Sequence, residues 1–240
     1  MIHWDEEGIR FMRDSAEHLK FAEVQAKHVL PYLPPEAAAC EGGCGLGYLS
    51  LALSPYVKHI TAVERSPAAL MVLRENLQKR RIGNITAVAA DIFSVKPERP
   101  YDVMVFCRFG AVEDILKLTA EQCGGTVVVL TLANSSHRFT LAEKAVRRKE
   151  WFSREELDKL KIPYRHEQFD VETGQPFRSL EDAVRFFQIY DRSGEPVTKE
   201  RVRSRLEPDP QGTYPLYSPM KSNFHLLAFY ADDVRRALRG

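Results

Sequence analysis

The chain has 240 residues, of which 44% are hydrophobic, so it can bury a complete core as one domain. Its 34 basic and 33 acidic side chains nearly cancel, which argues against a chain-wide field that would attract nucleic acid or an anionic membrane. It has no apolar run long enough for a membrane helix and no basic-then-apolar leader at its N-terminus. We therefore expect neither a membrane span nor a secretion signal.

Cysteine usage bears on the compartment and on metal binding. Cys40, Cys44, Cys107 and Cys123 are scattered through predicted strands and turns. Without a secretion signal they are expected to be reduced thiols of a cytoplasmic protein. Cys40 and Cys44 do not make a metal pair, because no second Cys/His pair with ligand spacing follows them. We therefore predict no metal site.

The N-terminal segment, residues 1–35, is predicted to be helical. Apolar side chains recur there at roughly helical spacing until a group of prolines stops the pattern. A dinucleotide-binding domain often begins directly with its first strand, whereas here a helical cap comes first. A helix that only packs on the sheet is the alternative for any single residue of this cap.

The cofactor-binding core is predicted at residues 36–135, where apolar runs alternate with helix-like segments. Ser66 and Pro67 supply an N-cap and a first-turn proline for a helix that continues to about Arg80. The predicted strands are residues 37–40, 59–63, 84–90, 101–106 and 125–132. Strands that are apolar throughout and separated by helices indicate a parallel sheet covered on both faces. The sequence therefore predicts a doubly wound α/β fold.

The C-terminal half, residues 136–240, continues the same domain. It is predicted to hold a basic helical segment, a sixth strand, a helical insert and a last strand, at residues 139–151, 164–171, 179–222 and 224–230 respectively. No internal repeat or sharp change of composition marks a second domain. We therefore predict one domain over residues 1–240 with a mostly parallel, seven-stranded sheet.

A glycine-rich stretch lies between the first predicted strand and the helix that follows it. It places an acid and three glycines in alternation, at Glu41, Gly43, Gly45 and Gly47. The dinucleotide fingerprint would require glycine at position 48, where this chain has Tyr48. The stretch resembles the first motif of class I S-adenosylmethionine-dependent methyltransferases, which have a Rossmann-like fold. A strand, a glycine turn and a helix in this order let backbone amides approach a ligand closely.

Acidic residues also follow the next two strands, and ligands bind at the carboxyl ends of the strands in such sheets. The resemblance implies that Glu41 organises the methionine end of the cofactor and that Glu64 accepts hydrogen bonds from its ribose. It further implies that Asp91 and Ile92 hold the adenine. The match covers roughly residues 37–132. The expected cofactor-binding residues are Glu41, Gly43, Gly45, Gly47, Glu64, Arg65, Asp91, Ile92 and Cys107, with S-adenosyl-L-methionine as cofactor and S-adenosyl-L-homocysteine as product.

The segment after the fourth strand bears on the methyl acceptor. Residues 106–110 read Phe-Cys-Arg-Phe-Gly, which departs from the Asn/Asp-Pro-Pro-aromatic motif and lacks the Pro-Cys pair of related enzymes. Methylation of exocyclic amines on bases and C5 methylation of cytosine are therefore not expected. Cys107 is a weaker candidate for a nucleophile than for a packing residue. Arg108 can pair with an anionic group of a substrate or form a surface salt bridge.

Further candidates lie in the C-terminal half. His137 follows the fifth strand and is the candidate general base, with an ordinary loop histidine as the alternative. Tyr214 and Tyr217 in a proline-bounded loop are candidate substrate residues. In the resembled family an N-terminal helical segment commonly covers the cofactor, which makes Trp4, Phe11 and Phe21 candidate lid residues.

The sequence therefore predicts S-adenosylmethionine-dependent methyl transfer to a small-molecule acceptor by in-line displacement. The alternatives are an NAD(P)-dependent oxidoreductase, an RNA methyltransferase that uses the basic run 138–149, and a non-catalytic nucleotide-binding module. The expected partner is a small molecule, with no membrane and, given the balanced charge, no nucleic acid. No prediction follows for the acceptor atom or the oligomeric state.

Overall fold

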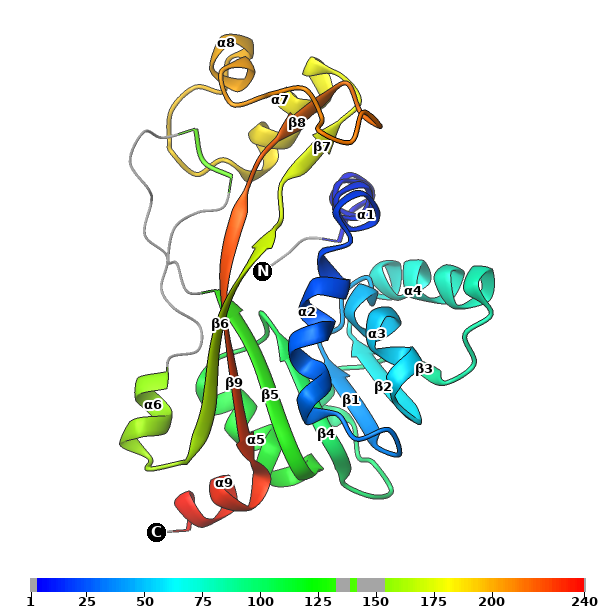
Figure 1. Cartoon of the computed structure of the whole chain (residues 1–240), viewed down its shortest axis with the longest axis vertical. Helices are drawn as coiled ribbons and strands as arrows, with labels where there is room; N and C mark the ends of the chain where they lie inside the picture. Colours follow the sequence, from blue (N-terminus) through cyan, green and yellow to red (C-terminus); the bar gives the residue numbers. More distant parts are fainter. Residues whose placement is uncertain (1–3, 133–138, 142–153, 240) are drawn as a thin grey trace.

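A seven-stranded sheet forms the centre of the computed structural model, which describes residues 4–132, 139–141 and 154–239 (Figure 1). The strands lie in the order β3-β2-β1-β4-β5-β9-β6. Their bounds are β1 Ala38–Gly42, β2 His59–Glu64, β3 Ile85–Ala89, β4 Tyr101–Cys107, β5 Cys123–Leu132, β6 Tyr164–Glu172 and β9 Lys221–Tyr230. The paired strands among β1–β5 are parallel, and β9 runs antiparallel to both β5 and β6. The predicted mostly parallel α/β sheet is confirmed.

Helices cover both faces of this sheet. The helices α2 Phe21–Val29, α3 Tyr48–Leu53 and α4 Pro67–Arg80 pack on one face, and α5 Val112–Gln122, α6 Arg154–Lys159 and α9 Ala231–Ala237 pack on the other. Short 3-10 turns lie at Leu30–Tyr32, Ser54–Tyr56 and Ile92–Ser94. Helix α4 begins as the sequence predicts, because the Ser66 hydroxyl accepts a hydrogen bond from the amide of Ala69 at 3.3 Å.

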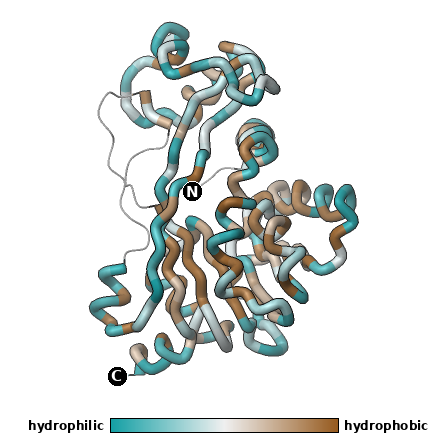
Figure 2. Tube along the Cα trace, in the orientation of Figure 1, coloured by the Kyte–Doolittle hydropathy of each residue, from teal (hydrophilic) through white to brown (hydrophobic). Residues whose placement is uncertain are grey.

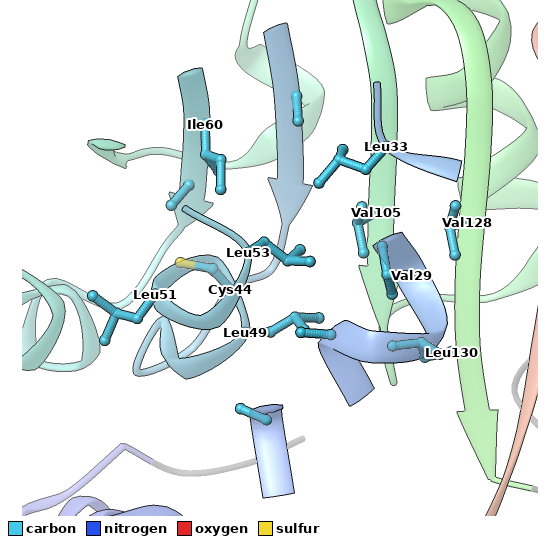
Figure 3. Packing of buried hydrophobic residues seen from close by; sticks show 14 of the residues in the cluster. Val29, Leu33, Cys44, Leu49, Leu51, Leu53, Ile60, Val105, Val128 and Leu130 are labelled. Atoms are coloured by element: carbon cyan, nitrogen blue, oxygen red, sulfur yellow. The ribbon is translucent and has the colours of Figure 1, made fainter. Parts of the chain in front are cut away.

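The inner strands are buried on both faces, which explains why they are apolar throughout. Val105 of β4 and Val128 of β5 face Leu49 and Val29 from the helices on one side (Figure 3). Their chain neighbours, such as Met104, belong to the cluster on the opposite face. Figure 2 shows the same contrast, with hydrophobic inner strands and a largely hydrophilic edge strand β6.

The predicted N-terminal helical cap consists of two helices, α1 Glu6–Leu19 and α2. They are separated at Lys20, which has a φ of 51° and so leaves the right-handed helical region. Phe11 and Phe21, two of the expected lid residues, are 1% and 9% exposed and belong to hydrophobic clusters. They are core residues. Trp4, the third, precedes α1.

The insert folds as a small unit with its own core, above the sheet in the orientation of Figure 1. In the structure this unit begins at β7 Gln175–Phe177, a few residues before the predicted start at 179, and β7 pairs antiparallel with β8 Leu216–Ser218. Its helices are α7 Leu180–Tyr190 and α8 Lys199–Arg203. Strand β8 lies within a segment expected to be a loop. Strands of three residues carry too little periodicity for the sequence pattern to reveal them.

Helix α1 joins this insert to the rest of the molecule. Phe11 packs against the ring of Phe186 at a centroid distance of 4.9 Å. The Asp14 carboxylate pairs with Arg178 at 2.9 Å, and His18 Nε2 lies 2.8 Å from the Asp209 carboxylate. Because His18 and Asp209 are both buried, their contact is shielded from solvent. Helix α1 is therefore fixed to the insert along its length.

Within the described part of the chain, none of the helices combines the length and apolar character needed to cross a bilayer. The predicted basic helix at 139–151 lies mostly outside the described residues, which include only positions 139–141 of it.

Gly125→Ala should destabilise the sheet by about 1–3 kcal/mol, because a core that is already packed resists added atoms. A Cβ at Gly125 would lie 2.3 Å from the backbone oxygen of Asp102, and backbone cannot move aside cheaply. Urea unfolding measures the loss. The matched control is Gly83→Ala, where no atom lies within 4 Å of the added Cβ. Equal stability of the two variants would contradict the close approach of β4 and β5.

Candidate functional site

The glycine turn, residues 43–47, is hydrogen-bonded to the end of β2. The amides of Gly43 and Cys44 both donate to the carbonyl oxygen of Val63, at 2.8 and 3.0 Å. Gly43, Gly45 and Gly47 have φ values of 69°, 55° and 75°, a backbone region that side chains disfavour. The turn therefore needs glycine at all three positions.

Two aromatic rings lie against this turn. A Cβ at Gly43 would lie 2.4 Å from the ring of Phe109, and one at Gly45 would lie 2.9 Å from the ring of Trp4. Phe109 follows β4, and Trp4 precedes α1, so the two rings come from distant parts of the sequence. Sequence reasoning missed Phe109; its position two residues after the fourth strand is the only local signal.

Backbone amides of the turn donate within the protein, which differs from the expectation that they face a ligand. Gly47 donates to the carbonyl of Cys44, and Gly45 donates to the Glu64 carboxylate at 3.1 Å. The other Glu64 oxygen accepts from the amide of Ser66 at 2.9 Å. Glu64 is only 8% exposed, so this carboxylate fixes the turn to the start of α4.

Glu41 lies inside β1 beside this turn and is 3% exposed. Burial raises the pKa of its carboxyl to about 7, although a hydrogen bond from the Ser50 hydroxyl opposes this shift. The like charge of Glu64 raises the pKa of Glu41 further. Two buried carboxylates that repel each other at one turn are suited to a ligand that brings a positive charge. These two acceptor groups fit S-adenosylmethionine, which carries a cationic sulfonium and amino group.

The predicted adenine residues lie at the neighbouring strand end. Asp91 is exposed, and its carboxylate accepts from the amide of Phe93 at 3.0 Å as the cap of a 3-10 turn. Ile92 is 4% exposed and belongs to the cluster that contains Val63. Arg65, which directly follows Glu64, is exposed. The three predicted acids thus lie at the ends of three adjacent strands.

At the end of β4, Cys107 is half-buried and packs against the core. Arg108 is exposed and has a φ of 53°, and its amide donates to the carbonyl of Leu130 at 2.8 Å. This left-handed residue turns the chain sharply after β4. The turn brings Phe109 back over Gly43.

The remaining predicted residues do not gather at the glycine turn. Tyr217 is 2% exposed, and its hydroxyl donates at 2.6 Å to the carboxylate of Glu172, the last residue of β6. Tyr214 is partly exposed, and its ring lies 5.2 Å from that of His18. His137 lies outside the described residues.

A cavity of about 300 Å³ opens in the insert. Its lining includes Phe139, Phe187, Arg205 and Met220. None of its lining residues belongs to the glycine turn or to the ends of β1–β4, so this cavity is separate from the site described above.

Glu41→Gln should raise the stability of the ligand-free protein, and the gain should grow as the pH rises from 5 to 8. Because the pKa of Glu41 is raised in the folded state to about 7, the neutral carboxyl stabilises the fold below the ordinary pKa. That contribution is lost as the pH rises through about 7. The amide stays neutral, so the gain is on the order of 2 kcal/mol at pH 8.

Thermal unfolding over this pH range measures the effect. Glu36→Gln is the matched control, because Glu36 is an exposed glutamate just before β1. A constant difference between Glu41→Gln and wild type at every pH would contradict the buried titration.

Comparisons with known proteins bear on this site. Residues 39–124 match the model of a family described as a methyltransferase domain. A curated protein described as the probable ribosomal RNA small subunit methyltransferase A of Methanothermobacter thermautotrophicus is 28% identical over 90 residues, 37% of this chain. The match spans only 32% of that relative's length.

Solved structures share the fold over most of the chain. YcgJ of Bacillus subtilis aligns with a TM-score of 0.55 at 15% identity, over 88% of this chain and 98% of that one. Coclaurine N-methyltransferase bound to N-methylheliamine and SAH aligns with a TM-score of 0.52 at 13% identity, over 86% and 71%. The methyltransferase model supports the predicted family, enzyme class and cofactor over the nicotinamide alternative, and the solved structures show the predicted fold. Over residues 39–124 the chain is therefore similar to a methyltransferase domain.

Proposed function

We propose that this protein transfers the methyl group of S-adenosylmethionine to a small-molecule acceptor by in-line displacement. The observation that carries the proposal is the glycine turn with its two buried carboxylates, Glu41 and Glu64, at the carboxyl ends of adjacent parallel strands. The cofactor supplies an electrophilic methyl group on a sulfonium. The protein has to orient the two reactants and exclude water.

In this proposal each acid has its own part of the cofactor. Glu41 pairs with the cationic methionine end, where a positive charge offsets the cost of its burial. Glu64 accepts from the ribose hydroxyls with lone pairs that its two backbone contacts leave available. Asp91 and Ile92 take the adenine, the first as an acceptor and the second as an apolar surface. Arg65 and Cys107 complete the cofactor-binding set.

The acceptor would enter near the end of β4, where Arg108 is exposed. Tyr214 stays a candidate for the acceptor side, since its ring is only partly buried. The buried hydroxyl of Tyr217 favours a structural part for that residue. His137 stays the candidate base for an acceptor that must lose a proton.

A small-molecule acceptor and a cytoplasmic location agree with two further observations. The balanced charge of 34 basic and 33 acidic residues gives no chain-wide attraction for nucleic acid. None of the four cysteines forms a disulfide in the structure, as a reducing compartment allows.

An RNA acceptor is the second candidate, and the similarity to a ribosomal RNA methyltransferase favours it. Cofactor-binding cores are shared between enzymes with different acceptors, because function depends on sites that vary on a common fold. A match over 37% of the chain therefore supports the cofactor more strongly than the acceptor.

Glu64→Gln should weaken binding of S-adenosylhomocysteine by about tenfold, because a charge-assisted hydrogen bond becomes a neutral one. Titration calorimetry gives the dissociation constant. Glu113→Gln, on an exposed position of α5, is the matched control and should bind as wild type does. Thermal unfolding of both variants shows whether the turn stays folded. An unchanged dissociation constant for a folded Glu64→Gln would rule out the ribose assignment.

The two acceptor classes separate in a labelling experiment with methyl-labelled cofactor. With a mixture of small amines, phenols and carboxylates, label should appear in acid-soluble product. With total RNA, it should stay at background at every salt concentration, since phosphate contacts would make RNA binding salt-dependent. Acid-precipitable, nuclease-sensitive label would reject the small-molecule proposal in favour of RNA.

A further inference from the structure

Trp4 and Phe109 lie on opposite sides of the glycine turn. Trp4 belongs to a cluster with Leu46 and the α4 residues Ala69 and Val72. Phe109 packs against the cluster on the other face of the sheet, where its ring lies 5.4 Å from that of Phe106. The turn is therefore flanked by one ring from each face.

Both rings approach the turn as closely as glycine allows. Any side chain at Gly43 would collide with Phe109, and any side chain at Gly45 would collide with Trp4. The two glycines therefore allow both the positive φ of the turn and the close contact with the rings. Since the backbone amides of Gly43 and Gly45 donate within the protein, the groups left for a ligand beside the turn are the two carboxylates, Glu41 and Glu64, and the two rings.

The position of Trp4 is fixed by the start of α1. The next residue, Asp5, caps this helix, and its carboxylate accepts from the amide of Gly8 at 2.7 Å. Helix α1 is in turn held to the insert through the Asp14–Arg178 pair. Trp4 therefore has a defined place over Gly45.

Methyl transfer changes the charge on the sulfur of the cofactor. The sulfonium of the methyl donor is a cation, and breaking the sulfur–methyl bond leaves its electron pair on a neutral thioether. Aromatic faces attract cations, and the attraction grows where water is excluded. A pair of rings beside the sulfonium would therefore interact more strongly with the donor than with the product.

We propose that Trp4 and Phe109 contact the cofactor and make the site prefer the charged methyl donor over the neutral product. This inference rests on the proposed function. The preference lowers product inhibition, because the product loses an interaction that the donor had. The half-buried Trp4 and Phe109 thereby distinguish the methyl donor from its product, and they do not select the acceptor.

Titration calorimetry with S-adenosylmethionine and S-adenosylhomocysteine tests this proposal. Trp4→Leu and Phe109→Leu should each lower the ratio of donor affinity to product affinity by about fivefold, the scale of one cation–π contact. Trp4→Phe keeps a ring and should keep most of the ratio. Met12→Leu is the matched control, since Met12 packs in the same cluster as Trp4 without an aromatic ring and should not change the ratio.

A tryptophan fluorescence titration provides a second readout. The chain has two tryptophans, so Trp151→Phe leaves Trp4 as the single reporter. Its emission should change on saturation with either ligand. An unchanged emission would overturn the proposed contact.

The outcomes distinguish this proposal from the one it rests on. If wild type binds neither ligand, the proposed function fails. If folded Trp4→Leu and Phe109→Leu lose donor and product affinity equally, the rings only pack, and the preference for charge is rejected while the function stands. Unchanged affinities for both ligands in both variants would also reject the preference for charge.

Discussion

The hydrogen bonds from Gly43 and Cys44 to the carbonyl of Val63 are the contact on which the site depends. They hold the turn after β1 against the end of β2, so that Glu41 and Glu64 lie beside one another. The turn can make this contact only with positive φ at alternate positions, which glycine adopts without strain. The same lack of side chains admits the rings of Trp4 and Phe109.

Without a ligand, the two buried carboxylates lower the folding stability of the protein. Glu41 is buried near a second carboxylate, and burial raises its pKa to about 7. Buried charged residues make an empty binding site less stable than apolar residues at the same positions would. Binding sites often have this property, because their residues serve ligand affinity rather than folding stability. The cationic end of the cofactor would remove the repulsion between the two acids. If the cofactor binds as proposed, ligand binding and folding stability are linked through the Glu41 carboxyl.

Helix α1 connects the two parts of the molecule that the proposed reaction requires. Its first turn follows Trp4 at the glycine turn, and its later residues pair with the insert through Asp14 and His18. The insert carries Tyr214, a candidate for the acceptor side. Helix α1 is therefore the element that contacts the insert and follows directly on the residue packed against the glycine turn.

Local signals in the sequence determined the sheet, the start of α4 at Ser66 and the glycine turn, because capping, periodicity and glycine conformation act within a few residues. Only the tertiary structure decided that Phe109 packs on Gly43 and that the hydroxyl of Tyr217 donates a hydrogen bond to Glu172. Both contacts join residues far apart in the chain. Such contacts depend on which elements meet in the fold, and the periodic pattern of one element does not show which other element it meets. The glycine turn and the acids after the strands were therefore predictable from the sequence, whereas these two long-range contacts were not.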